Sequence, residues 1–360
     1  MKYLLHSKDA ACYRVDPAGP PTRVLLCSTA ASRELLTDPV VTGHRYRSLL
    51  AGAVATALDL AARADPGLAA ALAAESTTVV NILRGGLGFG VDAALAERFG
   101  YPGAVSFVGT DRGASHPLGI SYERWEFTGR QLLVLGDIIG TGATAEKVLR
   151  AALDAARGRG AQLAGYLVLT VGSRQGIARL HRYFAELADS GEEFSAFIVA
   201  LEALFELPGS ARLGQSFPQL PFDFLRAPGR SAPDFELHRL AARDSLFEKC
   251  AVYDGGVRAF TPDEHRRFRA QWWARVRRLE SETGLSLADL GRGTAGLDRY
   301  ARPLEEWREG LDWAAAENLR HLGVDHAHLH ALGRRAYAYA ERTALGAYAD
   351  ARLAAGEPSR

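Results

Sequence analysis

The stretch LLVLGDIIGTGATAEKVL, residues 132–149, decides how this chain is interpreted. Its first residues are apolar in the manner of a buried strand, and a helical pattern follows from residue 143. Between the two stand one acidic residue, Asp137, a pair of isoleucines and the small-residue loop 140–144. The chain therefore places one carboxylate and a turn rich in hydroxyl groups at a strand-to-helix junction.

The loop 140–144 predicts a phosphate-binding cradle. Small residues let the backbone turn tightly and direct successive N–H groups at one point, and the following helix adds its positive end. Two better-known phosphate loops are excluded. The G-x-x-x-x-G-K-[ST] pattern is absent, because Lys147 lies three residues beyond Thr144. The G-x-G-x-x-G pattern, begun at Gly86 and Gly88, fails because Val91 stands at its third glycine.

Asp137 directly precedes this cradle. A carboxylate that pointed at a phosphate would repel it, whereas one that faces a sugar can accept hydrogen bonds from the sugar hydroxyls. The two features together predict a sugar 5-phosphate as the ligand.

The rest of the first two hundred residues alternates between strand and helix patterns. Strands are expected at 22–29, 77–86, 103–111, 131–139, 164–173 and 195–204, with helices at 43–64, 90–100 and 143–160. Strands this apolar expose neither face to solvent, so we expect a parallel twisted sheet flanked by helices. Such sheets bind ligands beyond the carboxyl ends of their strands, where the loops 84–90 and 136–144 would meet.

The loop-rich segment 206–235, which contains five prolines, is the best internal boundary. We therefore expect an α/β domain over 1–235 and a hood hairpin with a mainly helical C-terminal extension over 236–360. The hairpin is predicted at 250–260 and would form the hood with residues 3–15. Thr261, Pro262 and Glu264 predict a helix start with a capping box.

Composition excludes several classes of protein. The 43 Lys and Arg nearly balance the 42 Asp and Glu, and no basic stripe or helix-turn-helix pattern suggests nucleic acid. No run approaches the roughly 18 apolar residues of a membrane span, and the N-terminus is not a signal peptide, so a cytoplasmic protein is expected. The three cysteines, Cys12, Cys27 and Cys250, are too scattered for a disulfide framework, and no metal-ligand cluster is apparent.

At this point the two loops resemble a known family. LLVLGDIIGTGAT (132–144) resembles the phosphoribosyl-pyrophosphate (PRPP) signature of type I phosphoribosyltransferases, and ILRGGLGFG (82–90) resembles their pyrophosphate loop, most closely that of uracil phosphoribosyltransferases. The resemblance implies Mg²⁺ as cofactor, a homodimer, and a mobile flap at 107–127. It implies PRPP binding by Arg84, Gly85, Gly86, Asp137, Ile139, Gly140, Thr141, Gly142, Ala143 and Thr144. Asp137, Arg84 and the flap residue Arg112 would be catalytic.

The acceptor is expected to be a planar molecule. In the uracil-type relatives the base is read after the last core strand, where Phe205, Phe222 and Phe224 could stack on a ring or simply pack in the core. The uracil-recognition sequence is not recognisable, which leaves a purine, a modified pyrimidine or another aromatic acceptor.

The sequence departs from the family pattern at two positions. Gly136 replaces the first of its two acidic residues, and Gly140 stands where purine-salvage members carry an acidic base. The missing acid leaves open a regulatory protein that binds PRPP with little or no turnover. The lack of any motif in the C-terminal extension leaves open a structural partner whose extension serves as a scaffold.

Overall fold

The computed structural model describes residues 1–15, 19–83, 85–100, 103–111, 118–207, 229–242, 246–247, 256–294, 296–308, 311 and 315–355. Its strands are β1 (Lys2–Ser7), β2 (Ala10–Val15), β3 (Thr22–Thr29), β4 (Ser76–Leu83), β5 (Ala104–Asp111), β6 (Gly119–Arg124), β7 (Arg130–Ile139), β8 (Gln162–Ser173), β9 (Ser195–Phe205) and β10 (Arg230–Ser231).

The helices of the first two hundred residues are α1 (Ala30–Thr37), α2 (Gly43–Ala64), α3 (Pro66–Ala74), the 3-10 turn η1 (Gly85–Phe89), α4 (Val91–Phe99), α5 (Ala143–Gly158) and α6 (Arg174–Asp189). Those that follow are α7 (Pro233–Ala241), α8 (Val257–Phe260), α9 (Pro262–Thr283), α10 (Leu287–Thr294), η3 (Leu297–Ala301), α11 (Leu304–Arg308), α12 (Ala316–Leu319), η5 (Arg320–Leu322), α13 (His326–Arg342) and α14 (Leu345–Ala354).

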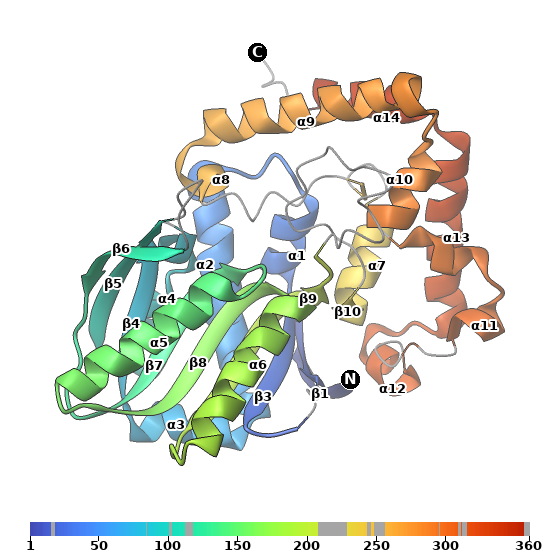
Figure 1. Ribbon diagram of the computed structural model, residues 1–360. Helices are drawn as coiled ribbons and strands as arrows, with labels where there is room; N and C mark the ends of the chain where they lie inside the picture. Colours follow the sequence, from blue (N-terminus) through green and yellow to red (C-terminus); the bar gives the residue numbers. More distant parts are fainter. Residues whose placement is uncertain are drawn as a thin grey trace. The chain divides into compact units, whose positions relative to one another are not determined.

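The central sheet has the order β1-β2-β3-β9-β8-β7-β4-β5-β6, with β7 in its interior (Figure 1). Parallel ladders join β3 to β9, β8 to β7, β7 to β4 and β4 to β5, while β1, β2 and β6 run antiparallel at the two edges. The α/β fold with a mostly parallel sheet is as the sequence predicts. Residues 3–15 form β1 and β2 and extend this sheet.

Helices cover both faces of the sheet. In Figure 1, α5 and α6 lie over one face, and α2 and α3 lie behind it. The buried residues of α5 recur at helical spacing: Ala145, Val148, Leu149, Ala152, Leu153 and Ala156. The strands beneath are buried along almost their whole length, as a sheet covered on both sides requires.

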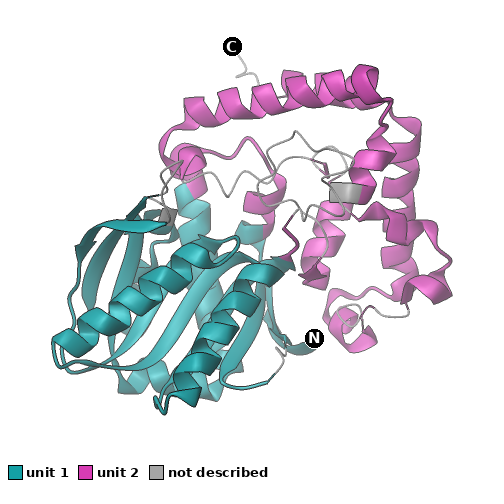
Figure 2. Cartoon of the chain, viewed as in Figure 1, with its two compact units in different colours: residues 1–32, 47–204 teal, residues 33–46, 205–360 magenta. Residues whose placement is uncertain are grey.

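The chain divides into two compact units, coloured separately in Figure 2. The first, residues 1–32 and 47–204, contains the parallel sheet; the second, residues 33–46 and 205–360, is mainly helical. In the second unit, Trp272 and Trp273 of α9 are buried, and Trp273 packs edge-on against Tyr348 of α14 with ring centroids 5.4 Å apart.

Two local predictions for the second unit turn out differently. Val257–Phe260 forms helix α8 rather than the second strand of the predicted hairpin; residues 248–255 lie outside the described part of the chain. Arg258 in α8 donates to the carbonyl oxygen of Val41 at 2.6 Å and lies over the ring of Tyr46. Helix α9 begins at Pro262 as predicted, but Thr261 donates its hydroxyl to the Glu264 carboxylate at 3.0 Å, and its side chain caps no backbone N–H.

No helix in the described part of the chain is both long and apolar enough to span a bilayer.

Candidate active site at the carboxyl end of strand β7

Asp137 lies near the end of β7, directly before the loop that leads into α5. Its carboxyl group is partly buried, and this burial raises the pKa of Asp137 from 3.8 to about 7. A hydrogen bond from the backbone N–H of Ile138 favours the charged form but offsets only part of the shift. A strand-end carboxylate held near its titration point is a common feature of ligand-binding and catalytic sites.

Gly136, the position of the missing acid, has no room for a side chain. A Cβ atom placed there would lie 2.5 Å from Cγ2 of Val91 and 2.8 Å from Cβ of Phe89. Phe89 is fully buried and Val91 is nearly so. The space that a first acidic side chain would need is therefore filled by apolar groups from η1 and the start of α4.

The loop 85–90 packs directly on β7. A Cβ atom at Gly86 would lie 3.0 Å from the carbonyl oxygen of Gly136, so the absence of a side chain lets the two backbones meet. Gly90, at the end of η1, adopts a left-handed φ of 57°. The structure thus brings together the two loops that the sequence singled out.

The first residues of the cradle, 140–142, rest on the first turn of α6. Ser173 caps that helix by accepting from the N–H of Gly176 at 2.9 Å, and donates its hydroxyl to the carbonyl oxygen of Gly140 at 2.6 Å. A Cβ atom at Gly176 would collide with the carbonyl oxygen of Gly140, and one at Gly142 would lie 2.9 Å from the carbonyl oxygen of Gly176. Glycines on both sides thus fix the loop's shape.

Helix α5 begins at this cradle without a side-chain cap. Its N-cap, Gly142, has a left-handed φ of 77°. Thr141 is exposed, and its hydroxyl accepts from the N–H of Ala143 at 3.5 Å, a long hydrogen bond. Glu146 in the first turn is paired with Arg179 and Arg150, so its charge is compensated before it can repel an anion. The positive end of this 16-residue helix, whose N-cap residue has no side chain, suits a phosphate group.

Sequence reasoning missed Thr170, which lies opposite Asp137 in the ladder between β8 and β7. Residues paired across a parallel ladder point to the same face of the sheet. The Thr170 hydroxyl is buried and has no hydrogen-bond partner among the described residues. Its only signal in the sequence was its place near the end of the neighbouring strand, as for Ser173.

Glu202 is a second residue that the sequence did not reveal. It is fully buried in β9 and is the one described non-glycine residue with a positive φ, 64°. Its Oε1 accepts from the backbone N–H of Thr29 at 2.8 Å and from the hydroxyl of Ser32. The strained Glu202 backbone is thus held by contacts with the carboxyl end of β3.

Several predicted site residues fall outside the described residues: Arg84, Arg112, Phe222 and Phe224. Of the rest, Gly85 opens η1, and Ile139 is buried in the core. Phe205 is 1% exposed, with its ring edge-on to that of Phe235 at 6.0 Å, so it packs in a core. Around the predicted flap, β5 and β6 pair antiparallel on either side of residues 112–117.

No group of three or more His, Cys, Asp or Glu side chains suited to a metal occurs among the described residues. Of the two carboxylates that flank the cradle, Glu146 is paired with arginines, and Asp137 makes no ion pair with any described residue. A single carboxylate fits an ion such as Mg²⁺, which is commonly held by one or two carboxylates together with substrate phosphates and water.

No protein-family model matches the sequence, and no match was found among curated proteins. Solved structures of several phosphoribosyltransferases overlap part of the chain. A hypoxanthine phosphoribosyltransferase from Staphylococcus aureus has 15% identity and a TM-score of 0.25, and the overlap covers 33% of this chain and 61% of that one. The hypoxanthine-guanine enzyme of L. donovani has 12% identity, a TM-score of 0.30 and coverage of 47% and 86%. The adenine enzyme of Trypanosoma brucei has 13% identity, a TM-score of 0.31 and coverage of 49% and 82%. Overlap at such TM-scores carries no weight for function, which is inferred below from the chain's own residues.

Proposed function

We propose that the chain is a phosphoribosyltransferase, which transfers the 5-phosphoribosyl group of PRPP to a planar nucleobase-like or aromatic acceptor and releases diphosphate. The observation that supports this most directly is the arrangement at the end of β7. A desolvated carboxylate, Asp137, stands shortly before the N-terminus of helix α5, whose N-cap is Gly142, and the glycine loop 85–90 packs on the same strand.

Each part of the site has one task in this proposal. The backbone of 140–144 holds the 5-phosphate at the positive end of α5. Asp137 accepts hydrogen bonds from the ribose hydroxyls and faces the positive charge that builds on the sugar as the bond at C1 lengthens. Arg84, with the N–H groups of Gly85 and Gly86, stabilises the leaving diphosphate, and Arg112 covers the site from the flap.

Asp137 must be ionised to do this. Because burial places its pKa at about 7, the free protein holds a mixture of both forms at neutral pH. When bound, Mg²⁺ would neutralise diphosphate charge beside Asp137. We expect ligand binding to lower the pKa of Asp137 and to release a proton, and kcat/KM to rise as the pH passes through the pKa of the free protein.

A second function is favoured by one observation. Phe89 and Val91 close the space of the first acidic residue, which the family pattern uses for the ribose. With one carboxylate instead of two, the chain could bind PRPP as a signal with little or no turnover. The same site serves both hypotheses, and the difference lies in the rate of the chemical step.

Calorimetry with PRPP, with and without Mg²⁺, tests the shared premise. We expect Mg²⁺-dependent binding, and a hundredfold excess of PRPP over Kd should raise the free energy of unfolding by about 2.7 kcal/mol. Asp137→Asn should weaken binding about tenfold, since charge-assisted hydrogen bonds contribute roughly 1.5–3 kcal/mol. Asp154→Asn, the same change at an exposed position of α5, is the matched control. Absence of PRPP binding would refute both functions.

Turnover separates the enzyme from the signal-binding protein. The protein is incubated with PRPP, Mg²⁺ and a panel of purines, pyrimidines and aromatic acids, and release of diphosphate is measured. We expect release with one acceptor class. Arg84→Ala should lower kcat as well as PRPP affinity, because the diphosphate charge grows in the transition state, while ribose 5-phosphate affinity stays unchanged. PRPP binding without turnover across the panel would favour the regulatory function.

A further inference from the structure

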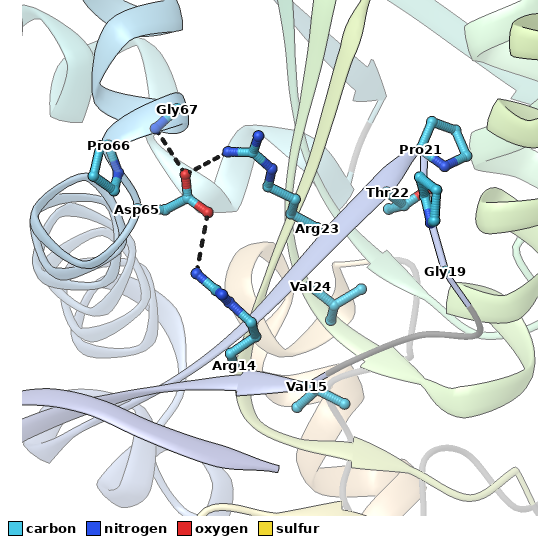
Figure 3. A pocket seen from close by; sticks show the side chains of 11 residues that line it. Arg14, Val15, Gly19, Pro21, Thr22, Arg23, Val24, Asp65, Pro66 and Gly67 are labelled. Atoms are coloured by element: carbon cyan, nitrogen blue, oxygen red, sulfur yellow. Dashed lines mark hydrogen bonds and ion pairs between the residues drawn. The ribbon is translucent and has the colours of Figure 1, made fainter.

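A charged cavity lies in the first unit, away from the candidate active site. It has a volume of about 690 Å³ and is lined at its polar side by Arg14, Arg23 and Asp65 (Figure 3). Pro20 and Pro21 line another part of it.

The cavity adjoins the first residues of β3, whereas Asp137 and the cradle lie at the last residues of β7. Strand β3 is parallel to β9, and the first residue of β9 lies against Gly165 near the start of β8, which is parallel to β7. The two sites are thus at opposite ends of the parallel strands.

Asp65 uses only one of its two carboxylate oxygens. Oδ1 accepts from Nη1 of Arg23 at 2.8 Å and from the backbone N–H groups of Gly67 and Leu68 at 2.9 and 3.1 Å, which caps helix α3. Oδ2 is buried and has no hydrogen-bond partner among the described residues. Nη2 of Arg14 lies 3.9 Å from Oδ2, which is beyond hydrogen-bond distance. Helix capping explains Oδ1 and leaves Oδ2 unexplained.

The two arginines carry one positive charge more than Asp65 neutralises. Their side chains are 42% and 53% exposed, while that of Asp65 is 2% exposed. Arg14 makes no side-chain hydrogen bond to any described residue, and Arg23 makes one, to Asp65. Guanidinium groups in this position pair readily with phosphate or carboxylate oxygens.

The Arg23 guanidinium occupies the space that a side chain at position 67 would need. A Cβ atom at Gly67 would overlap the Arg23 guanidinium and lie 3.1 Å from Oδ1 of Asp65. The glycine therefore lets Arg23 reach over the helix start and hold one edge of the carboxylate, while the other edge is directed toward Arg14 (Figure 3).

We propose that this cavity binds a small oxyanion that retains an O–H group, as inorganic phosphate does at neutral pH. Arg14 and Arg23 contact its negative oxygens, and Oδ2 of Asp65 accepts its O–H. An acceptor-only anion such as sulfate offers no proton to Oδ2 and meets a carboxylate instead. The cavity exceeds the volume of one phosphate, so a phosphate monoester with a nearby hydroxyl group shares the required chemistry.

Calorimetry of the whole chain at pH 7 and constant ionic strength tests the proposal with three probes: inorganic phosphate, sulfate and glycerol 3-phosphate. We expect phosphate to bind about tenfold or more tightly than sulfate. Tighter binding of glycerol 3-phosphate would identify a monoester as the natural ligand, and weaker binding would identify free phosphate. Equal affinity for phosphate and sulfate would overturn the role of Asp65.

Variants assign the binding to this cavity. Arg14→Gln should remove it, while Arg63→Gln, which replaces an exposed arginine on α2 that does not line the cavity, should not. Gly176→Ala, which disturbs the cradle beside α5, should leave it unchanged and so separates it from phosphate bound there. Equal phosphate binding in Arg14→Gln and Arg63→Gln would overturn the proposal.

Two substitutions separate charge from proton acceptance. Asp65→Asn should keep its amide oxygen on the helix N–H groups and turn its NH₂ group toward the cavity, which should bring the preference for phosphate over sulfate close to one. Gly67→Ala should push Arg23 away and weaken both anions without changing that preference. An unchanged preference in Asp65→Asn, with the fold verified by circular dichroism, would contradict the assignment.

Discussion

Asp137 and Asp65 are carboxylates at opposite ends of the parallel strands, and their surroundings differ. Asp65 is clamped by an arginine and two backbone N–H groups, with a second arginine nearby. Asp137 receives one backbone hydrogen bond, and burial raises its pKa to about 7. A carboxylate that the fold compensates contributes to stability, whereas one left uncompensated is costly to ionise until a ligand supplies the missing partners. This difference supports the proposal that Asp137 meets a ligand whose binding compensates its charge.

The largest change in the free energy of unfolding is expected for a substitution at Gly136, where neighbouring side chains leave no space. Gly136→Asp, which places an acid where the PRPP signature has one, should lower the free energy of unfolding by about 3 kcal/mol or more, because overpacking alone costs about 1–3 kcal/mol and the new charge adjoins Asp137. Urea unfolding measures it. The control is Gly52→Asp on α2, where nothing lies within 4 Å of the added atom. A stable Gly136→Asp protein would show that Phe89 and Val91 yield easily.

Asp65→Ala tests the compensated carboxylate. The substitution removes a helix cap and the bond to Arg23, so we expect the free energy of unfolding at pH 7 to fall by about 2 kcal/mol. Asp154→Ala on the exposed face of α5 should change it by less than about 0.5 kcal/mol. If the two variants unfold alike, Asp65 contributes nothing to stability and the contrast with Asp137 fails.

Removal of the Asp137 charge should raise the free energy of unfolding at high pH, whereas removal of the Asp65 carboxylate should lower it. Since the pKa of Asp137 is raised from 3.8 to about 7, its protonated form is favoured in the folded state, and that stability is lost as the pH rises through this range. Asp137→Asn should match the wild type near pH 4 and be more stable by about 1–2 kcal/mol at pH 8, after allowance for solvent access. Chemical unfolding across this range measures the difference. A variant less stable than the wild type at pH 8 would mean that a cation already compensates Asp137.

The smallest effect concerns two buried threonines. Thr78 donates its hydroxyl to the carbonyl oxygen of Glu126 at 2.9 Å, whereas that of Thr170 has no partner among the described residues. Thr78→Val should cost about 1 kcal/mol, and Thr170→Val should be neutral within about 0.5 kcal/mol or stabilising. If the Thr170 hydroxyl serves the ligand, PRPP affinity should fall about two- to fivefold in Thr170→Val alone. Equal destabilisation by both changes would show that Thr170 has a partner in solution.

The sequence predicted the parallel sheet and the β7–α5 junction because their signals are local. A run of apolar residues, one acid and a glycine loop lie within eighteen positions, and the expected strand and helix form there. The filled space at Gly136 could not be predicted, because Phe89 and Val91 reach it from more than forty residues earlier. The same holds for Ser173 and Gly176, which shape the cradle from the next strand-helix junction.

Val257–Phe260 shows a local pattern overridden by tertiary contacts. Its alternation and the preceding glycines are typical of a hairpin, yet Arg258 is buried against the carbonyl oxygens of Asp38 and Val41. A buried guanidinium needs such acceptors, and the helical turn supplies the geometry. Partners more than two hundred positions away in the sequence decide the conformation.

The packing of Phe89 and Val91 against Gly136 also limits how this site can evolve. An acid at position 136 needs smaller side chains at 89 or 91, while trimming those first leaves a cavity against Gly136, at a cost of roughly 2–5 kcal/mol for a large-to-small change. Either order of substitution passes through a destabilised protein. The effects of substitutions at the three positions therefore depend on one another. A site with two acids requires at least two substitutions, of which the first alone destabilises the protein.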